Sequence, residues 1–307
     1  MEFDSKIYIA GHRGLVGSSL VRNLKQQGYT NIQHLDKSIL DLRNQKDVSE
    51  YFEYSKPDYV FLAAAKVGGI NYNKQYPADF ILDNLQIQNN IIESSFKNNV
   101  KKLMFLGSAC IYPKVTPQPI KEDYLLTGPL EPTNEGYALA KIAGLKMCQM
   151  FRQQYGFDAV SVMPANLYGI NDNFNIEQCH VIPAMIQKFH NAKLRNEKVT
   201  LFGDGTPTRE FLYVDDLAEA LIFLMNTYSD PDHINIGSGE EYSIKELAVM
   251  VAETVGYNGE IEWDVSKPNG TPRRKLDIKK ISDLGWKPRH SIRNGLLTTY
   301  DWFLNNV

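Results

Sequence analysis

The stretch Ile7-Tyr8-Ile9-Ala10-Gly11-His12-Arg13-Gly14-Leu15-Val16-Gly17 decides the fold of this chain. Its first four residues form the kind of apolar run that predicts a buried strand. Three glycines follow, and apolar residues then recur at helical spacing through Leu20, Val21 and Leu24. A strand, a glycine turn and a helix in this order are typical of a dinucleotide site, because the helix N-terminus offers free amides and partial positive charge to a pyrophosphate. We expect residues 11–17 to contact such a cofactor.

The next strand bears on which dinucleotide is bound. We expect this strand at residues 31–35, followed by Asp36 and Lys37. An acidic residue about 20 positions after the glycines usually binds the ribose 2′-hydroxyl of NAD. Lys37 and Arg13 favour the opposite choice, since cations neutralise the 2′-phosphate of NADP. The residues alone therefore leave both cofactors open, and a polar side chain at Asp41 is placed to reach the adenine.

The strand and helix pattern continues through the first half of the chain. Further strands are expected at residues 59–65, 102–106 and 159–163, and helices at 79–98 and 137–153. Strands separated by helix-length segments predict a parallel, doubly wound Rossmann sheet of the α/β class. Open parallel sheets place their ligands at the carboxyl ends of the strands. We therefore expect cofactor contacts at Leu106 and Gly107 and at Pro164-Ala165-Asn166-Leu167.

The alternation of strands and helices ends near residue 170. Loop-like and turn-rich segments follow, among them the basic run 267–275, and residues 232–307 read as short elements. We predict a Rossmann domain formed by residues 1–167 with about 210–230 added. Residues 168–209 and 231–307 are predicted to form a smaller C-terminal α/β domain that binds the substrate.

Tyr137 and Lys141 are the candidate catalytic pair. They lie four residues apart in an expected helix and therefore share one face. A phenol with a pKa of about 10 is a poor acid or base at neutral pH. An ammonium group held nearby favours the phenolate and brings that pKa toward the working range. Such a pair is common on amphipathic helices, and it gains meaning here from the dinucleotide site.

Composition limits the remaining classes. The chain has 307 residues, 43% of them hydrophobic and 22% charged, as is ordinary for a soluble globular protein. A net charge of −3 gives no strong attraction to nucleic acid or to a membrane surface. No signal peptide precedes the first strand, and no apolar run approaches the ~18 residues of a membrane span. The irregular spacing of Cys110, Cys148 and Cys179 argues against disulfides or a metal site, so we expect a cytoplasmic protein.

Together these residues resemble the extended short-chain dehydrogenase/reductase family. The glycine turn, Ser108 after a strand, Tyr137 with Lys141, and Pro164-Ala165-Asn166 carry the general likeness. The more specific pieces of the resemblance, spread over nearly the whole chain, are residues 10–14, 63–69, 110–114, 130–141, 180–183, 209–211 and 267–273. The resemblance is greatest to members that act on GDP-4-keto-6-deoxy-D-mannose with NADPH, which favours NADP over NAD.

The resemblance also implies roles for individual residues. Tyr137 would protonate the 4-keto oxygen of the GDP-sugar, Lys141 would hold the nicotinamide ribose, and Ser108 would hydrogen-bond the same oxygen. Cys110 and His180 would be the base and the acid of epimerisation at C3 and C5, with His180 also near the cofactor. Contacts to the GDP-sugar are implied at Lys188, Phe202, Arg209 and Asp277.

Position 110 separates this chain from related activities. The resemblance places an Asp-Glu pair in dehydratases of the family where Ala109 and Cys110 stand here, so water elimination would lack its acid and base. A lone cysteine after a strand is more often a small buried hydrophobe. The resemblance, rather than spacing, raises Cys110 and His180 above such ordinary readings.

The sequence also allows other functions. One is a 4-ketoreductase without epimerisation on a related GDP-keto-sugar, such as a GDP-heptose; Phe202, whose size alters the pocket, leaves room for it. Another is a silent NADP-binding redox partner, which the presence of both Tyr137 and Lys141 disfavours. We expect a homodimer through the apolar stripes of helices 79–98 and 137–153, although these stripes also suit burial within one chain.

Overall fold

The structure is a computed structural model that describes residues 1–267 and 269–307. Pro268, part of the basic run quoted above, lies outside the described residues. A central sheet of six parallel strands has the order β2-β1-β3-β4-β5-β9. Its strands are β1 (Ile7–Ala10), β2 (Ile32–Gln33), β3 (Tyr59–Leu62), β4 (Lys102–Leu106), β5 (Ala159–Pro164) and β9 (Ile234–Ile236).

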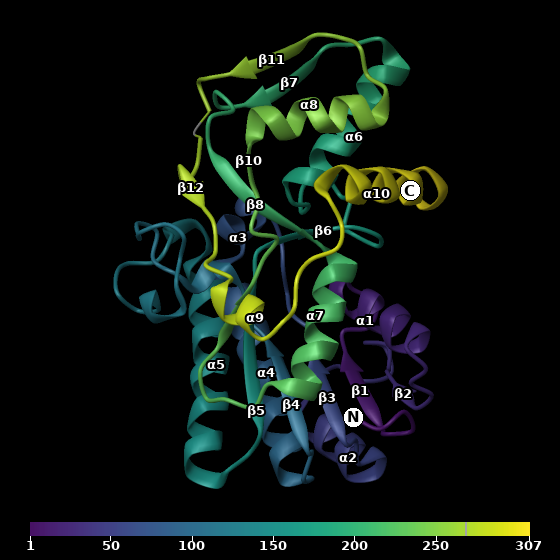
Figure 1. The fold of residues 1–307 in the computed structure, drawn as a ribbon, viewed down its shortest axis with the longest axis vertical. Coiled ribbons are helices and arrows are strands. Elements are labelled where there is room, and N and C mark those ends of the chain that lie inside the picture. The colour runs from purple at the N-terminus through teal and green to yellow at the C-terminus, as the bar shows by residue number, and fades with distance from the viewer. Residues whose placement is uncertain (268) are drawn as a thin grey trace.

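Helices cover both faces of this sheet (Figure 1). On one face α1 (Leu15–Gln26) packs against α7 (Val214–Thr227). On the other face α4 (Pro77–Lys97) packs against both α2 (Gln45–Ser55) and α5 (Glu135–Tyr155). Strands β1, β4 and β5 are buried along their whole length, as strands covered on both faces must be. The predicted doubly wound parallel sheet is therefore confirmed.

Element boundaries differ from the predictions at the sheet edge and at helix starts. The second strand is only Ile32–Gln33 rather than 31–35, because this edge strand pairs with β1 on one side alone. The third strand ends at Leu62 rather than at residue 65. Helix α4 begins two residues early, with Pro77 at a position where its missing N–H costs nothing.

The rest of the chain forms a smaller α/β group beyond the carboxyl ends of the sheet (Figure 1). Its strands are β6 (Asn166–Tyr168), β7 (Val199–Phe202), β8 (Thr208–Tyr213), β10 (Glu241–Ser243), β11 (Ile261–Asp264) and β12 (Arg273–Arg274). Its helices are α6 (Val181–Arg195), α8 (Ile244–Val255) and α10 (Ile292–Asn306). Shorter helices are α3 (Ile70–Gln75), α9 (Lys279–Asp283), η1 (Ala109–Ile111), η2 (Glu122–Tyr124) and η3 (Pro132–Asn134).

The expectation of only short elements in residues 232–307 was wrong. Helices α8 and α10 have 12 and 15 residues. Each begins at a serine whose side chain accepts a hydrogen bond from the first turn, Ser243 in α8 and Ser291 in α10. At α8 the Glu246 side chain also binds back to complete a capping box.

Two buried hydrophobic clusters underlie the two groups of elements. The predicted domain limits placed all of residues 231–307 in the second group, but β9 pairs with β5 inside the central sheet. Ile281 and Trp286 also lie in the first cluster. We therefore propose that β9 and the segment from α9 to Trp286 be counted with the Rossmann domain. In the described part of the chain, no helix combines the length and apolar character needed to cross a membrane.

Candidate active site

The glycine turn after β1 is packed too closely for side chains at two of its glycines. Gly11 has a φ of +90°, and a Cβ atom there would lie 2.7 Å from the Ala64 backbone beyond β3. A Cβ atom at Gly17 would overlap the carbonyl group of Gly11. The chain runs from β1 to β2 on one side and later to β3 on the other, so this turn lies at the switch point of the sheet. Gly14 caps α1 without a side-chain hydrogen bond, which leaves the first amides of the helix open to an anion.

The carboxylate of Asp36 already contacts Arg13 and His12. His12 Nε2 lies 3.1 Å from one carboxylate oxygen of Asp36, and the Arg13 guanidinium donates to the other. Burial lowers the pKa of His12, and the neighbouring His34 ring, stacked at 4.2 Å, acts in the same direction. Lys37 is exposed beside them. The acceptor that would hold a ribose 2′-hydroxyl is therefore occupied, and positive charge borders it.

Asp41, predicted to reach an adenine, lies in a pair with Arg43. The guanidinium donates to both carboxylate oxygens, at 3.0 Å from Nε and 2.6 Å from Nη2. Hydrogen bonding to Arg43 lowers the pKa of Asp41 to about 2. Arg43 in turn reaches Asp83 on α4 at 3.2 Å. The sequence reasoning missed this pair, although a carboxylate and an arginine two residues apart were there to suggest it.

The ends of β4 and β5 lie where the cofactor prediction requires. A Cβ atom at Gly107 would overlap the Met163 sulfur, so the flexible end of that side chain would have to shift. Beyond β5, the Ala165 amide donates to Ile236 of β9 at 2.8 Å. The exposed Asn166 side chain donates to the Glu210 carbonyl at 3.0 Å. Pro164 is buried and Leu167 half-buried, and the cofactor contacts of all these residues remain predictions.

Tyr137 and Lys141 lie on the first turns of α5, facing the end of β4. The buried Lys141 ammonium donates to the Leu106 carbonyl oxygen at 2.8 Å and lies 4.9 Å from the centre of the Phe105 ring. Burial lowers the pKa of Lys141 to about 8. Its Nζ is 5.9 Å from the centre of the Tyr137 ring. The ammonium is thus close to the phenol but directed at a backbone carbonyl.

The expected lowering of the Tyr137 pKa was wrong. Burial raises the pKa of this phenol, the Cys110 thiol adds to the rise, and a side-chain hydrogen bond with Ser108 opposes it. The physical reason is desolvation by the surrounding protein, which disfavours the charged phenolate; the Phe80 ring lies edge-on to the phenol ring, with the two ring centres 6.4 Å apart. Tyr137 is therefore protonated at neutral pH, the state that a proton donor requires.

Ser108 and Cys110 share a short turn that follows β4. The Ser108 hydroxyl caps η1 by accepting a hydrogen bond from the Cys110 amide at 3.2 Å. The thiol of Cys110 is partly exposed and close enough to Tyr137 to affect its pKa. The structure therefore brings Ser108, Cys110 and Tyr137 together. Cys148 is buried, and Cys179 lies elsewhere on the loop before α6.

His180 begins α6, and the loop before it packs on the segment after β3. The Gly69 amide donates to the Gln178 carbonyl at 2.8 Å, and a Cβ atom at Gly69 would come within 2.7 Å of the Cys179 carbonyl. The imidazole of His180 is reachable from solvent, yet surrounding protein atoms lower its pKa. At neutral pH it is then mostly uncharged and retains one N–H to donate.

The same loop contains a carboxyl group that the sequence reasoning missed. Asp172 is only 9% exposed. One of its oxygens accepts the Asn173 amide at 2.7 Å, and the other has no hydrogen-bond partner among the described residues. Burial raises the pKa of Asp172 to about 7.

Basic side chains flank an exposed aromatic ring in the second group of elements. Phe202 at the end of β7 is 58% exposed. The Lys188 ammonium lies 4.9 Å from its ring centre, and that of Lys267 lies 6.0 Å away. Arg209 on β8 is largely enclosed and donates to its neighbour's carbonyl, and burial together with the charge of Arg274 lowers its pKa. An aromatic face with cations beside it suits a nucleobase and its phosphates.

Asp277, the fourth predicted substrate contact, has other partners. Its carboxylate accepts the Lys279 amide at 2.9 Å at the start of α9. Its own amide donates to the Ile120 carbonyl at 2.8 Å. The contacts that the structure gives for Asp277 thus involve neither Lys188 nor Phe202. In the described ranges, no group of three or more His, Cys, Asp or Glu side chains is placed to hold a metal ion.

A dinucleotide turn at a sheet switch point, opposite a buried lysine and a protonated tyrosine, defines a nucleotide-dependent enzyme of the extended dehydrogenase/reductase class. This chain belongs to the NAD dependent epimerase/dehydratase family, whose sequence profile it matches over residues 7–237.

Individual relatives cover nearly the whole chain. It is 58% identical to the putative GDP-L-fucose synthase 2 of Arabidopsis thaliana, over 100% of this chain and 94% of the relative. It is 49% identical to the GDP-L-fucose synthase of Escherichia coli K12, over 98% of this chain and 97% of that protein. A GDP-mannoheptose C4 reductase from Campylobacter jejuni, solved with NADP bound, superposes with a TM-score of 0.91 at 41% identity and covers 99% of both chains.

Proposed function

We propose that this protein converts GDP-4-keto-6-deoxy-D-mannose to GDP-L-fucose, by epimerisation at C3 and C5 followed by NADPH-dependent reduction at C4. The observation that carries the proposal is the meeting of the Ser108–Cys110 turn with Tyr137 at the end of β4. This arrangement places a thiol and two hydroxyl donors close together, near the predicted dinucleotide site. The names and high identities of the relatives support the same activity.

The chemistry suits these side chains. A ketone at C4 makes the hydrogens at C3 and C5 acidic, because each carbanion delocalises onto the 4-oxygen. Cys110 removes a proton as a thiolate, and the protonated form of His180 returns one to the opposite face of the sugar. The hydroxyls of Ser108 and Tyr137 donate to the 4-oxygen and stabilise the negative charge that builds there in both reactions. When bound, NADPH supplies the hydride that reduces C4.

Residues around the glycine turn fit NADP better than NAD. The open amides of α1 suit the pyrophosphate, and the missing side chains at Gly11 and Gly17 keep the turn tight. The charge of Arg13 offsets that of Asp36, which weakens the repulsion of a 2′-phosphate, and His12 also contacts the carboxylate. Arg13 is 77% exposed at its side chain and is therefore free to turn toward that phosphate. NADP in the related Campylobacter jejuni structure agrees with this assignment.

We place the GDP part of the substrate against Phe202, with Lys188 and Arg209 nearest its charged groups. The cations beside the exposed ring support this placement. The carboxylate of Asp277 accepts the Lys279 amide at the start of α9, and its contact with the substrate stays a prediction. The irregular, unpaired cysteines and the low net charge support a cytoplasmic location.

A second candidate is a 4-ketoreductase that acts on a GDP-heptose without epimerisation. The similarity to the Campylobacter jejuni reductase favours it. In that case Cys110 and His180 would be present but unused.

The decisive experiment follows NADPH oxidation with GDP-4-keto-6-deoxy-D-mannose in heavy water, with analysis of the product. We expect GDP-L-fucose with deuterium at C3 and C5. The Cys110→Ser variant should lose this deuterium incorporation by about 10²-fold or more, the usual contribution of general acid–base catalysis. It should still oxidise NADPH with substrate that has been epimerised beforehand. Cys179→Ser is the matched control, and oxidation without deuterium in the product would favour the second candidate.

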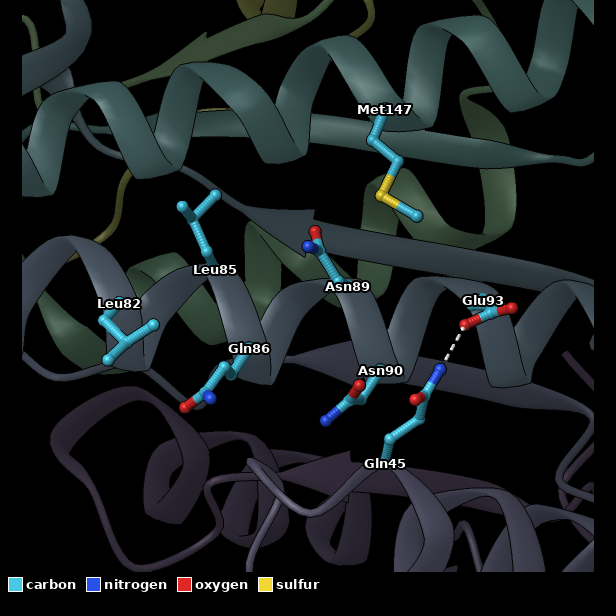
Figure 2. Close-up of a pocket in the computed structure, with 8 residues that line it drawn as sticks. All are labelled: Gln45, Leu82, Leu85, Gln86, Asn89, Asn90, Glu93 and Met147. Carbon is cyan, nitrogen blue, oxygen red and sulfur yellow. Dashed lines mark hydrogen bonds between the residues drawn. The ribbon is translucent and has the colours of Figure 1, made fainter.

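We also propose a homodimer formed through α4 and α5. A groove of about 550 Å³ runs along these helices. Figure 2 shows its lining side chains, with α4 below α5. The lining contains apolar side chains, neutral amides and one carboxylate, at Gln45, Leu82, Leu85, Gln86, Asn89, Asn90, Glu93 and Met147. Leu82 is 56% exposed. Apolar side chains open to solvent on two adjacent helices are typical of a surface that another subunit covers.

A further inference from the structure

Residues 273–277 connect the substrate group of elements with the turn that carries Cys110. On one side, β12 pairs with β8, and Arg274 is the register partner of Arg209. On the other side, the Ile120 amide donates to the Lys275 carbonyl at 2.8 Å. This short strand is therefore hydrogen-bonded both to the proposed GDP-binding strand and to the chain that follows Cys110.

The Arg274 side chain extends from this strand to the Cys110 turn itself. Its Nη1 donates to the Ala109 carbonyl at 3.1 Å, and its Nη2 donates to the Pro113 carbonyl at 3.2 Å and the Tyr112 carbonyl at 3.4 Å. In the described part of the chain, no carboxylate lies within ion-pair distance of Arg274. A planar guanidinium with several fixed donors holds such acceptors in one geometry.

The turn needs an external partner of this kind. Helix η1 has only three residues, and its ring-closing bond from Tyr112 to the Ala109 carbonyl is long, at 3.4 Å. Within the same turn the Ile111 amide donates to the Ser108 carbonyl at 3.2 Å, and the Cys110 amide donates to the Ser108 hydroxyl. Short 3₁₀ turns have poor hydrogen-bond geometry, so the position of the thiol depends on what holds the carbonyls on either side of it.

We propose that Arg274 is a positioning residue for the reaction. It clamps the turn that presents Ser108 and Cys110, from a strand whose register partner, Arg209, is a proposed substrate contact. Binding of the GDP group and placement of the thiol then depend on the same pair of strands. This inference rests on the proposed function, and it deepens that function by assigning Arg274 a part in the same site.

The test compares Arg274→Ala with Arg273→Ala. Arg273 lies on the same strand, but its guanidinium binds Glu241 at the surface, where ion pairs contribute little. In heavy water, Arg274→Ala should lower the kcat for deuterium incorporation by about 10²-fold, the usual cost of misplacing a reacting group by about 1 Å. The KM for NADPH should stay unchanged, because the glycine turn is not involved. Arg273→Ala should behave like the parent.

Rescue separates positioning from a structural role. Added guanidinium chloride at concentrations below denaturation should restore part of the lost rate in Arg274→Ala. Arg274→Lys should recover less than the arginine gives, because one ammonium cannot hold separate carbonyls in a fixed plane. A lost rate without rescue, accompanied by a matching fall in thermal stability, would overturn the proposal.

Hydrogen exchange tests the clamp without any substrate. Amides of the peptide spanning residues 108–113 should exchange faster in Arg274→Ala than in the parent, and not in Arg273→Ala. Unchanged exchange would overturn the clamp. If the parent does not turn over the GDP-sugar but the exchange difference appears, the proposed function fails while the clamp stands.

Discussion

Lys141 has a buried ammonium group, and this gives the reductase a pH limit. Because burial lowers its pKa to about 8, Lys141 is charged below that pH and neutral above it. We expect kcat for NADPH oxidation to fall above pH 8 with an apparent pKa near 8, as the cation predicted to hold the nicotinamide ribose and to assist Tyr137 is lost.

The Lys141→Arg variant tests this assignment. Arginine keeps its charge over the whole working range, so the alkaline limb should move above about pH 10 even if the maximum rate is lower. The measurement is the pH profile of kcat between about pH 6 and pH 10 for both proteins. A limb that stays near pH 8 in the arginine variant would assign it to another group.

At this scale the sequence predicted which residues lie together better than how they behave. Tyr137, Lys141 and Cys110 were selected from spacing and resemblance; the structure brings them together, and their catalytic roles stay predictions. The pKa of Tyr137 was predicted in the wrong direction, because spacing on a helix does not reveal how far the surrounding protein desolvates the phenol. Arg274 was missed because its partner Ala109 lies 165 residues away.

Two similar substitutions in the glycine turn between β1 and α1 are expected to cause different defects. Gly17→Ala should destabilise the fold, since its Cβ atom would overlap the Gly11 carbonyl. Gly14→Ala meets only an ordinary contact at 3.5 Å, and the extended backbone there, with a φ of −76°, suits any residue, so stability should be nearly unchanged. Its methyl group would instead crowd the pyrophosphate at the helix start and raise the KM for NADPH.

Thermal unfolding and NADPH kinetics of the two variants check this pair. We expect a lower Tm for Gly17→Ala only, and a raised KM with a parental Tm for Gly14→Ala. The reverse assignment, or equal effects in both assays, would contradict the role given to the turn.

Asp172, in the loop before α6, is expected to lower the stability of the fold as pH rises. The buried Asp172 carboxyl has a pKa of about 7 in the native state, whereas an unfolded aspartate has a pKa of about 3.9. Between these values the native protein holds a proton that the unfolded chain releases, so stability falls as pH rises through this window. Asp172→Asn should therefore be more stable than the parent at pH 8, by up to about 4 kcal/mol, and similar to it at pH 4.

Urea unfolding of both proteins at the two pH values measures that difference. Its dependence on pH is the critical result, because a stability gain of equal size at pH 4 and pH 8 would show that ionisation of Asp172 is not the cause.

Strands and helices were predicted well where one sequence pattern was strong. The strand at 102–106 was found without error, since it is apolar and buried throughout. Helices α8 and α10 were overlooked, although the sequence contains the serine caps at Ser243 and Ser291 that begin them. The short strand β12 was beyond prediction, because only its pairing with β8 makes two arginines a strand.

At the scale of the whole molecule, the proposed dimer makes a direct prediction. Leu82→Glu places a charge in the groove between α4 and α5 and should produce a monomer. Leu297→Glu on α10 is the matched control, because Leu297 is equally exposed, at 55%, but lies far along the chain from the groove. Light scattering after size-exclusion chromatography measures the mass. A parent that is monomeric, or equal masses for both variants, would contradict the proposed interface.

The two-part architecture was predictable from the sequence, but its exact partition was not. The end of the alternation of strands and helices near residue 170 indicated the first boundary between the two predicted domains. The return of β9 to the central sheet is set by pairing between residues such as Val162 and Ile234, which no local pattern reports.

That late return of β9 matters while the protein is being made. A ribosome that has released the first 170 residues has exported five of the six strands, and β5 then stands as an unpaired sheet edge. It stays so until Ile234–Ile236 emerges and pairs with it. Open edges of this kind recruit other strands, and nascent chains with such edges are prone to misassembly. The Rossmann sheet is therefore completed only after synthesis has continued through β9, well beyond the first boundary between the two groups of elements.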